Sequence, residues 1–163
     1  MSPVPDKRTA QIRRRQKAAT GIRQGLRELR IQLARLNYHV GSGLGLKDVD
    51  LDCLDIIDAS GPLTPSALAR LAGLHPATMT GILDRLENWG WIVRERDPSD
   101  RRAVLVRSVR ERQADLQRTY APLSRSMNKL IASYSDKELE TIADFLTRCA
   151  EAGREATEEL AAG

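Results

Sequence analysis

Few side chains in this sequence are of the types that perform catalysis or bind metals. Only two histidines, His39 and His75, and two cysteines, Cys53 and Cys149, occur among its 163 residues. The sequence contains no His-Glu-x-x-His, Cys-x-x-Cys or Gly-x-Ser-x-Gly motif and no phosphate-binding Gly-x-x-x-x-Gly-Lys-Ser/Thr loop. We therefore predict a protein that is not an enzyme and that uses no cofactor and no metal site.

Two regulatory uses of these groups are open but less favoured. Asp48, Asp52 and Asp55 share one side of a predicted helix, where a solvated face is the simplest interpretation. With His39 they could instead converge on a regulatory cation. A redox switch would need an accessible thiol of low pKa, and neither cysteine has a partner nearby in sequence.

Polar side chains suited to nucleic-acid contact are concentrated further along the chain. Residues 94–102 read Arg-Glu-Arg-Asp-Pro-Ser-Asp-Arg-Arg, and arginine is well suited to phosphates and narrow minor grooves. Asp97 or Asp100 could clamp a neighbouring arginine and fix the shape of the segment. On composition alone it would be a solvated loop, so its neighbours decide its meaning. Its candidate DNA contacts are Arg94, Arg96, Asp97, Arg101 and Arg102.

A predicted helix just before this segment has an apolar side and a side of small, polar residues. It begins near His75-Pro76 and ends near Trp89-Gly90, and at 100° per residue its inward side is Met79, Ile82, Leu83 and Leu86. A helix of this kind fits the major groove, which shows a distinct pattern of donors and acceptors for each base pair. Its candidate DNA contacts are His75, Ala77, Thr78, Thr80, Gly81, Asp84 and Arg85.

Two of these candidates have an equally good structural interpretation. His75 could cap the helix instead of touching DNA. Gly81 costs about 1 kcal/mol relative to alanine inside a helix, which a close approach of DNA to the backbone would explain. A tolerated surface glycine would explain it equally well.

The surrounding pattern predicts a helix-turn-helix followed by a β-hairpin. A helix over 46–59 is followed by a short helix that Thr64 can cap, with a proline at its first position and a glycine past its end. Ile92-Val93 and Val104-Leu105-Val106 are β-type runs on either side of the charged segment. We therefore predict a winged helix-turn-helix DNA-binding domain over residues 46–108. Two further candidate contacts are Thr64 and Ser66.

Long amphipathic helices flank this domain, so the predicted class is mainly α with a small β-hairpin wing. Apolar residues recur at spacings of three and four from Ala10 to Val40, and Gly41-Ser42-Gly43 is expected to end that helix. Helices over about 109–133 and 135–160 are expected to start at capping boxes. The two boxes are Ser108 with Glu111 and Ser135 with Glu138.

The charge distribution favours pairing of two copies through these flanking helices. Residues 7–30 hold nine Lys or Arg and one acid, whereas residues 135–163 hold eight acids and three bases. Opposite ends of two subunits could meet, which would set their orientation more than their affinity. A direct DNA role for Arg13-Arg14-Arg15 is the alternative. We assign residues 9–45 and 109–163 to a helical dimerisation region.

Composition agrees with a soluble globular chain and a reducing compartment. The net charge is +4, with 41% hydrophobic and 29% charged residues, which fits a polyanionic partner without requiring one. No apolar run is long enough for a membrane span, and the basic N-terminus lacks the apolar stretch of a signal peptide. With only two distant cysteines, these features predict a cytoplasmic protein with no membrane partner.

The sequence resembles the MarR family of bacterial winged-helix regulators. The resembling segments are 61–69, 74–87, 90–93 and Asp97-Pro98-Ser99-Asp100-Arg101-Arg102-Ala103, of which the last is the most specific. The resemblance implies a homodimer on a near-palindromic operator, and repression or sometimes activation that a small ligand or oxidation relieves. It also implies Thr78 and Thr80 in the groove and Arg101 with Asp97 in the wing.

Two departures from the family pattern concern the site. A larger or basic side chain often stands where this sequence has Gly81, so one DNA contact could be absent. The Leu-Thr entry to the fifth helix is Ser108-Val109 here, which is expected to keep its cap through Ser108. The family's usual ligand pocket lies between the dimer helices and the winged domain. Candidate ligand-binding residues there are Asn37, Tyr38 and His39, although Tyr38 could be plain core.

A different class of function stays open as the alternative. Winged helices also serve as protein–protein adaptors that bind no DNA, and a fold does not fix a function. An adaptor would expose an apolar patch where this sequence places a basic wing and a polar helix face. The sequence therefore favours a DNA-binding repressor with double-stranded DNA, a second copy of itself and a small-molecule effector as partners.

Overall fold

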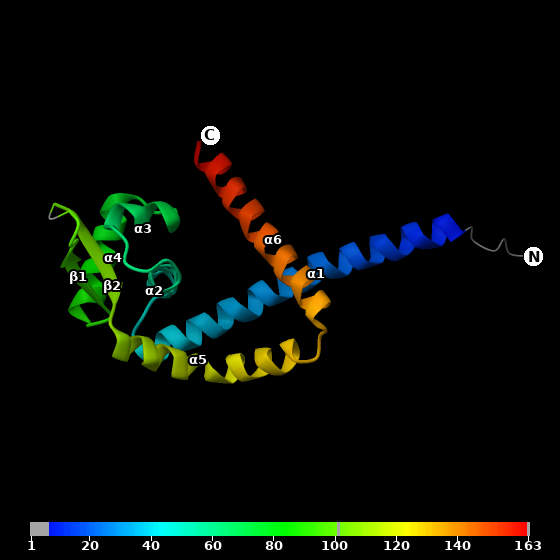
Figure 1. Cartoon of the computed structure of the whole chain (residues 1–163), viewed down its shortest axis with the longest axis horizontal. Coiled ribbons are helices and arrows are strands. Elements are labelled where there is room, and N and C mark those ends of the chain that lie inside the picture. The colour runs from blue at the N-terminus through cyan, green and yellow to red at the C-terminus, as the bar shows by residue number, and fades with distance from the viewer. Residues whose placement is uncertain (1–6, 101, 163) are drawn as a thin grey trace, which may run out of the picture. The chain divides into compact units, whose positions relative to one another are not determined.

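The structure, a computed structural model, describes residues 7–100 and 102–162 (Figure 1). Within them the chain is mainly helical with one antiparallel hairpin, which confirms the predicted fold class. Contacts divide the chain into two compact units, Met1–Leu51 and Asp52–Gly163. No helix of the described part is both long and apolar enough to cross a bilayer. The elements are α1 (Lys7–Leu44), α2 (Asp48–Ser60), α3 (Pro65–Leu71), α4 (Pro76–Asn88), β1 (Ile92–Arg96), β2 (Val104–Ser108), α5 (Arg110–Ile131) and α6 (Asp136–Ala162).

Helix α1 does not end at Gly41-Ser42-Gly43 as predicted, but runs on to Leu44. Gly45, with φ +73°, is the residue that terminates it, and the Leu46 N–H donates to the Gly41 carbonyl at 2.8 Å. Gly41 is buried inside the helix, and a Cβ there would lie 2.6 Å from the Leu46 carbonyl oxygen. The glycine therefore serves the close approach of the returning chain and not the end of the helix.

The apolar stripe of α1 is largely exposed. Ile22, Leu26 and Leu29 are 46%, 37% and 46% exposed, although they recur at the spacing of a single helix face. Exposed apolar residues also occur on the later helices, where Met127 and Leu130 of α5 are 41% and 52% exposed. Packing within the described residues therefore does not account for these apolar stripes.

Helix α2 begins with a carboxylate that the sequence analysis missed. Asp50 is fully buried, and its Oδ2 accepts a hydrogen bond from the Lys47 N–H at 2.8 Å. This bond satisfies a backbone donor at the helix start, as the second half of a capping box does. Of the expected buried side, Cys53 and Ile57 are buried, whereas Val49 and Ile56 are half-buried. Asp48, Asp52 and Asp55 are exposed, as a solvated face would be.

The two helices of the helix-turn-helix both end in the same backbone motif. After α3, Gly73 has φ +65° and the Leu74 N–H returns to the Ala69 carbonyl at 2.9 Å. After α4, Gly90 has φ +71° and the Trp91 N–H returns to the Leu86 carbonyl at 2.9 Å. Since an L side chain rarely adopts this conformation, glycine fixes both turns. The predicted glycine after α3 is confirmed.

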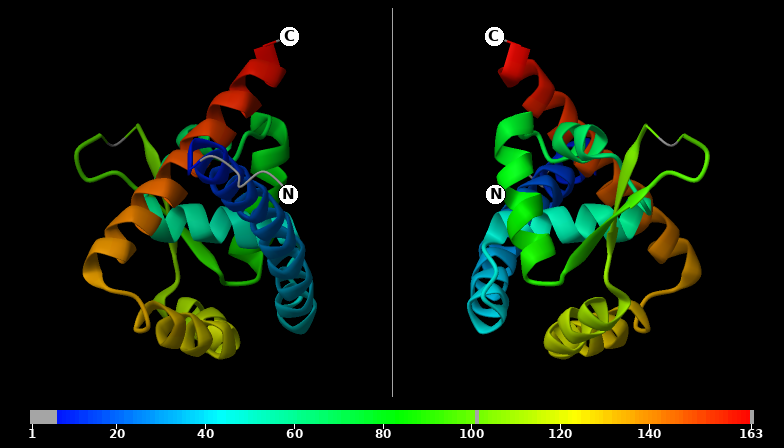
Figure 2. Two further views of the ribbon diagram at one scale, coloured as in Figure 1. Left: turned by 90° about the vertical axis from the view of Figure 1, so that its right-hand side faces the viewer. Right: turned by 90° about the vertical axis from the view of Figure 1, so that its left-hand side faces the viewer.

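The hairpin strands reach further into the charged segment than their apolar runs suggested. Strands β1 and β2 pair from Ile92 opposite Ser108 to Arg96 opposite Val104, and they run side by side in both views of Figure 2. The connecting tip is therefore 97–103 and not 94–102. Leu63 adds a short antiparallel bridge to the other edge of β2, where its N–H and carbonyl both bond Val106. A single bridging residue leaves no periodic signal in the sequence.

Helix α5 does not use the predicted capping box. Val109 is its N-cap and provides no side-chain hydrogen bond, while the Ser108 hydroxyl donates to Asp58 in α2. Ser108 still belongs to β2, so its side chain follows the strand and cannot reach the helix start. The second box is confirmed in part, because the Ser135 N–H donates to Glu138 Oε2 at 2.9 Å. Pro122 lies inside α5 and removes one helical hydrogen bond.

Replacing Gly41 by alanine should destabilise the protein by roughly 1–3 kcal/mol, because the new Cβ meets a backbone carbonyl that cannot move freely. Gly43 is the matched control, since it lies in the same helix and a Cβ there meets nothing within 4 Å. Gly43→Ala should therefore stabilise by about 0.5–1 kcal/mol through helix propensity. Urea denaturation at one fixed protein concentration measures both. Equal effects of the two substitutions would contradict the close approach at Gly41.

Candidate nucleic-acid interface

The apolar side of α4 fixes which side of this helix faces solvent. Met79, Ile82, Leu83 and Leu86 are 1%, 4%, 1% and 0% exposed, as predicted from their spacing. They lie in the same core as Leu68 of α3 and other apolar residues that are at most 3% exposed. These are Trp91, Ile92 and Val106. The opposite side of α4 therefore faces solvent. It displays Ala77, Thr78, Thr80, Gly81 and Asp84, all exposed, with Arg85 half-buried at its margin.

Gly81 lies in the middle of this exposed face and has open space around it. A Cβ built there meets nothing within 4 Å, so no packing within the described chain requires glycine. Thr80 turns its hydroxyl back to the Pro76 carbonyl at 3.1 Å, which leaves its methyl group outward. The centre of the exposed face is consequently flat, because only small side chains project from the helix there.

Several predicted contacts double as helix caps. The Ala67 N–H donates to Thr64 Oγ1 at 3.2 Å, and Ser66 Oγ lies 3.1 Å from the same oxygen. The Ala77 N–H donates to His75 Nδ1 at 3.3 Å, so His75 is the N-cap of α4. This geometry favours the capping interpretation of His75. Its ring remains exposed, as do Ser66 and Ala77.

The wing tip is shaped by two aspartates, which accept hydrogen bonds from residues of the tip itself. Asp97 Oδ1 accepts from the Ser99 N–H at 2.8 Å and from the Ser99 hydroxyl at 2.6 Å. Asp100 Oδ1 accepts from the Arg102 N–H at 3.0 Å. Short polar side chains commonly hold turns in this way, because they offer the backbone a local partner. Arg101, a predicted contact, lies outside the described residues.

Two wing arginines are available to a partner. Arg96 at the end of β1 and Arg102 in the tip are exposed, and neither makes an ion pair with another residue of the described chain. Arg107 differs, because its Nη2 lies 2.5 Å from Glu95 Oε1 on the facing strand. That hydrogen bond and the opposite charge lower the pKa of Glu95 and raise the pKa of Arg107. The pair fastens the strands below the tip.

Arg94 and Asp84, both predicted to contact DNA, are bonded to one another. Arg94 Nη2 lies 2.7 Å from Asp84 Oδ1, and Arg94 Nη1 lies 2.9 Å from Glu87 Oε2. The sequence analysis did not single out Glu87. Glu87 follows Asp84 by three residues, so the two acids lie on the same side of the helix. Two acids together on a helix otherwise suited to a polyanion were the signal in the sequence that a cation lies nearby. Arg85 instead lies over the Trp89 ring at 5.9 Å.

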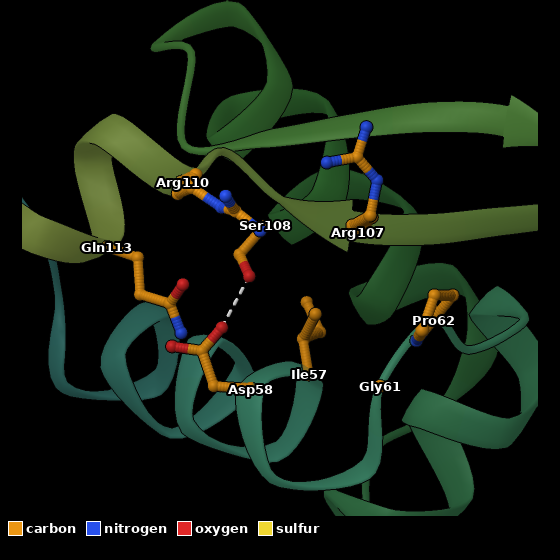
Figure 3. Close-up of a pocket in the computed structure, with 8 residues that line it drawn as sticks. All are labelled: Ile57, Asp58, Gly61, Pro62, Arg107, Ser108, Arg110 and Gln113. Atoms are coloured by element: carbon orange, nitrogen blue, oxygen red, sulfur yellow. Dashed lines mark hydrogen bonds between the residues drawn. The ribbon is translucent and has the colours of Figure 1, made fainter.

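A cavity of about 230 Å³ lies where the end of α2 faces the junction of β2 and α5 (Figure 3). The Ser108 hydroxyl donates to Asp58, and the side chain of Gln113 points toward the same carboxylate. Arg107 also lines the cavity but directs its guanidinium to Glu95. The bond between Ser108 and Asp58 therefore joins the end of α2 to the junction of β2 and α5.

The candidate ligand residues lie together on α1. Asn37 is half-buried, Tyr38 is 66% exposed, and the rings of Tyr38 and His39 meet edge to face at 5.7 Å between centroids. Tyr38 is therefore not core within this chain. Cys53 is fully buried and Cys149 half-buried. Among the described residues, no group of three potential metal-binding side chains comes together.

Comparison with known proteins agrees with this architecture. Residues 46–104 match the model of the MarR family. Over 137 residues the chain is 33% identical to YcgE of Bacillus subtilis strain 168, described as an uncharacterized HTH-type transcriptional regulator, across 84% of this chain and 89% of that relative. The chain belongs to the MarR family. It is thus a helix-turn-helix transcriptional regulator by family, and these relatives are regulators and not enzymes.

Two further proteins extend the comparison. The chain is 27% identical over 110 residues to the HTH-type transcriptional repressor YetL of Bacillus subtilis, with 66% of each chain covered. A MarR family protein from Bacillus stearothermophilus has the same fold, with a TM-score of 0.63 and 19% identity, over 84% of this chain and 96% of that one. At this identity, the structural likeness concerns the fold alone.

The hydrogen bonds at Asp97 should make the wing tip of this MarR-family chain sensitive to acid. They lower the pKa of Asp97, and the Ser99 hydroxyl is the largest cause. Because the folded pKa is depressed, their contribution is complete above the ordinary value and is lost as pH falls through the lowered one. Ser99→Ala should raise the pKa of Asp97 toward 3.8.

An NMR titration of the side-chain carboxyl signals measures this change. Glu138 is the internal control, because Ser135, far from the wing in sequence, lowers its pKa in the same way. An Asp97 pKa that stays low in Ser99→Ala would show that another group holds the carboxylate.

Proposed function

We propose that this chain is a homodimeric, sequence-specific DNA-binding regulator that reads its operator with α4 and positions itself with the hairpin wing. The observation that carries the proposal is the exposed face of α4. It is small and polar, lies opposite the buried apolar side, and precedes a wing with two exposed arginines that have no ion-pair partner in the described chain. Residues 46–108 would form the DNA-binding domain.

The two parts of the surface suit different parts of DNA. Thr78 and Thr80 offer hydroxyl and methyl groups of the kind that contact base edges in the major groove. Arg96 and Arg102 suit phosphates or a narrow minor groove, and such contacts fix register more than sequence. Thr64 and His75 lie at the starts of α3 and α4, and the start of a helix favours a phosphate. Arg101 would act with the other wing arginines.

A homodimer would explain the exposed apolar stripes of the terminal helices. Ile22 and Leu29 of α1 and Leu146 of α6 are between 46% and 47% exposed. Residues 9–45 and 109–163 would supply this interface in both subunits. A two-fold axis would then place two copies of α4 on a near-palindromic site.

Repression relieved by a small ligand is the regulatory output that we favour. The similar protein YetL is named a repressor. On α1, the half-buried amide of Asn37 and the rings of Tyr38 and His39 combine polar and apolar surface, which suits a small organic effector.

A protein–protein adaptor is the second candidate, and two exposed apolar side chains favour it. Leu71 at the end of α3 is 51% exposed, and Trp89 at the end of α4 is 42% exposed. An adaptor would bury such residues against its partner. The polar face of α4 and the basic wing would then have no evident use, which is why we rank it second.

Selection of bound fragments from a random DNA pool, followed by a salt titration, tests the proposal. We expect an inverted repeat with half-sites about one helical turn apart, and an affinity that falls steeply with salt. Arg102→Ala should reduce the salt slope by about two, because one phosphate contact is lost in each subunit of the dimer. If no sequence is enriched and binding is weak at every salt concentration, the adaptor becomes the better hypothesis.

Gly81→Ala separates a close DNA approach from a tolerated surface glycine. The methyl group meets nothing in the free protein, so stability should rise by about 0.5–1 kcal/mol. If base edges approach the backbone there, affinity for the selected site should fall about tenfold, since one good base contact is worth roughly 1–3 kcal/mol. Fluorescence anisotropy and urea denaturation measure the two quantities. Unchanged affinity would identify Gly81 as an incidental surface residue.

A further inference from the structure

Arg94 is held by carboxylates on α4 in a way that its neighbours in the wing are not. Its guanidinium donates through Nη2 to Asp84 at 2.7 Å and through Nη1 to Glu87 at 2.9 Å. Its side chain is 27% exposed, against 53% for Asp84 and 40% for Glu87. One planar group therefore joins β1 to two points of α4, a geometry that a lysine ammonium could not reproduce.

The two acids would otherwise work against DNA binding. Both lie on α4, and Asp84 belongs to the face proposed to enter the groove. Glu87 lies in the last turn of α4, where the helix dipole is negative and a carboxylate is unfavourable. Two uncompensated carboxylates there would repel phosphates. Arg94 supplies the opposite charge within hydrogen-bond distance of both.

A guanidinium engaged in this way differs from one available to phosphate. Arg96, two residues along β1, makes no ion pair within the described residues and is exposed. Arg94 would have to break two charge-assisted hydrogen bonds before it could contact DNA. The same residue type therefore serves two purposes within one strand.

We propose that Arg94 is a positioning residue that promotes DNA binding without contacting DNA, by tying the wing strand β1 to α4 and offsetting part of the negative charge of Asp84 and Glu87. This inference rests on the proposed DNA-binding function and adds a role for one of its residues. It replaces the expected contacts of Arg94 and Asp84 with an intramolecular pair.

The test compares Arg94→Gln in two backgrounds, the natural chain and the variant Asp84→Asn/Glu87→Gln. With both carboxylates present, we expect Arg94→Gln to weaken binding of the selected fragment about tenfold with an unchanged salt slope. Without them, the same substitution should cost less than about twofold, because there is no charge left to neutralise. Arg96→Gln is the matched control, which should lower the salt slope by about two in either background, one for each subunit of the dimer.

The opposite pattern would overturn the proposal. A direct phosphate contact predicts that Arg94→Gln costs the same in both backgrounds and lowers the salt slope each time. Amide hydrogen exchange of the free protein provides a readout that needs no DNA. Arg94→Gln should speed exchange in β1, whereas Arg96→Gln should not. If the natural chain binds no DNA but this difference appears, the proposed function fails while the tie between β1 and α4 stands; equal exchange in both variants would refute the tie itself.

Discussion

Burial of the apolar side of α4 is the constraint on which the candidate interface depends. Met79, Ile82, Leu83 and Leu86 are almost fully buried, and each such side chain is worth roughly 2 kcal/mol relative to exposure. The half-exposed ion pairs of Arg94 are worth at most about 1 kcal/mol each. Packing therefore fixes the rotation of the helix about its axis, and the ion pairs only adjust how the wing meets it. The buried side of α4 therefore determines which of its residues face solvent.

Helix ends set the rest of the geometry around α4. Glycines with positive φ close both helices of the helix-turn-helix, so the chain turns without a long loop and returns at once to the core. Trp91, the first residue after the second turn, is 3% exposed, and Arg112 of α5 lies over its ring at 5.0 Å. The turn, the strand and the start of α5 are thereby held to the same core that orients α4.

Periodic patterns in the sequence predicted the elements and the buried side of α4, because a spacing of three and four is a local property. Features that depend on where the chain returns could not be predicted in this way. Gly41 resembled a helix terminator, yet it is the point at which Leu46 comes back against α1. Ser108 resembled a cap, yet the strand carries its hydroxyl to Asp58, 50 residues away in sequence. In both cases a residue type suited to a local role is used in a tertiary contact.

The candidate site shows the same limit at the level of single side chains. Residue types identified the surface correctly as far as exposure goes, since the expected residues of α4 that face outward do so. Residue types could not distinguish Arg96 and Arg102, which make no ion pair within the described residues, from Arg94, which pairs with two carboxylates. That difference depends on which carboxylates the fold brings near each arginine. Arg94 and Arg96 are two residues apart in one strand, so their side chains leave the same face of the hairpin. Arg94 lies in the middle of β1, where Asp84 and Glu87 of α4 are within hydrogen-bond distance of its guanidinium. Arg96 is the last residue of β1, next to the tip, and there it is exposed and makes no ion pair within the described residues. The position of each arginine along the strand, and not the face from which its side chain leaves, therefore gives the two their different environments.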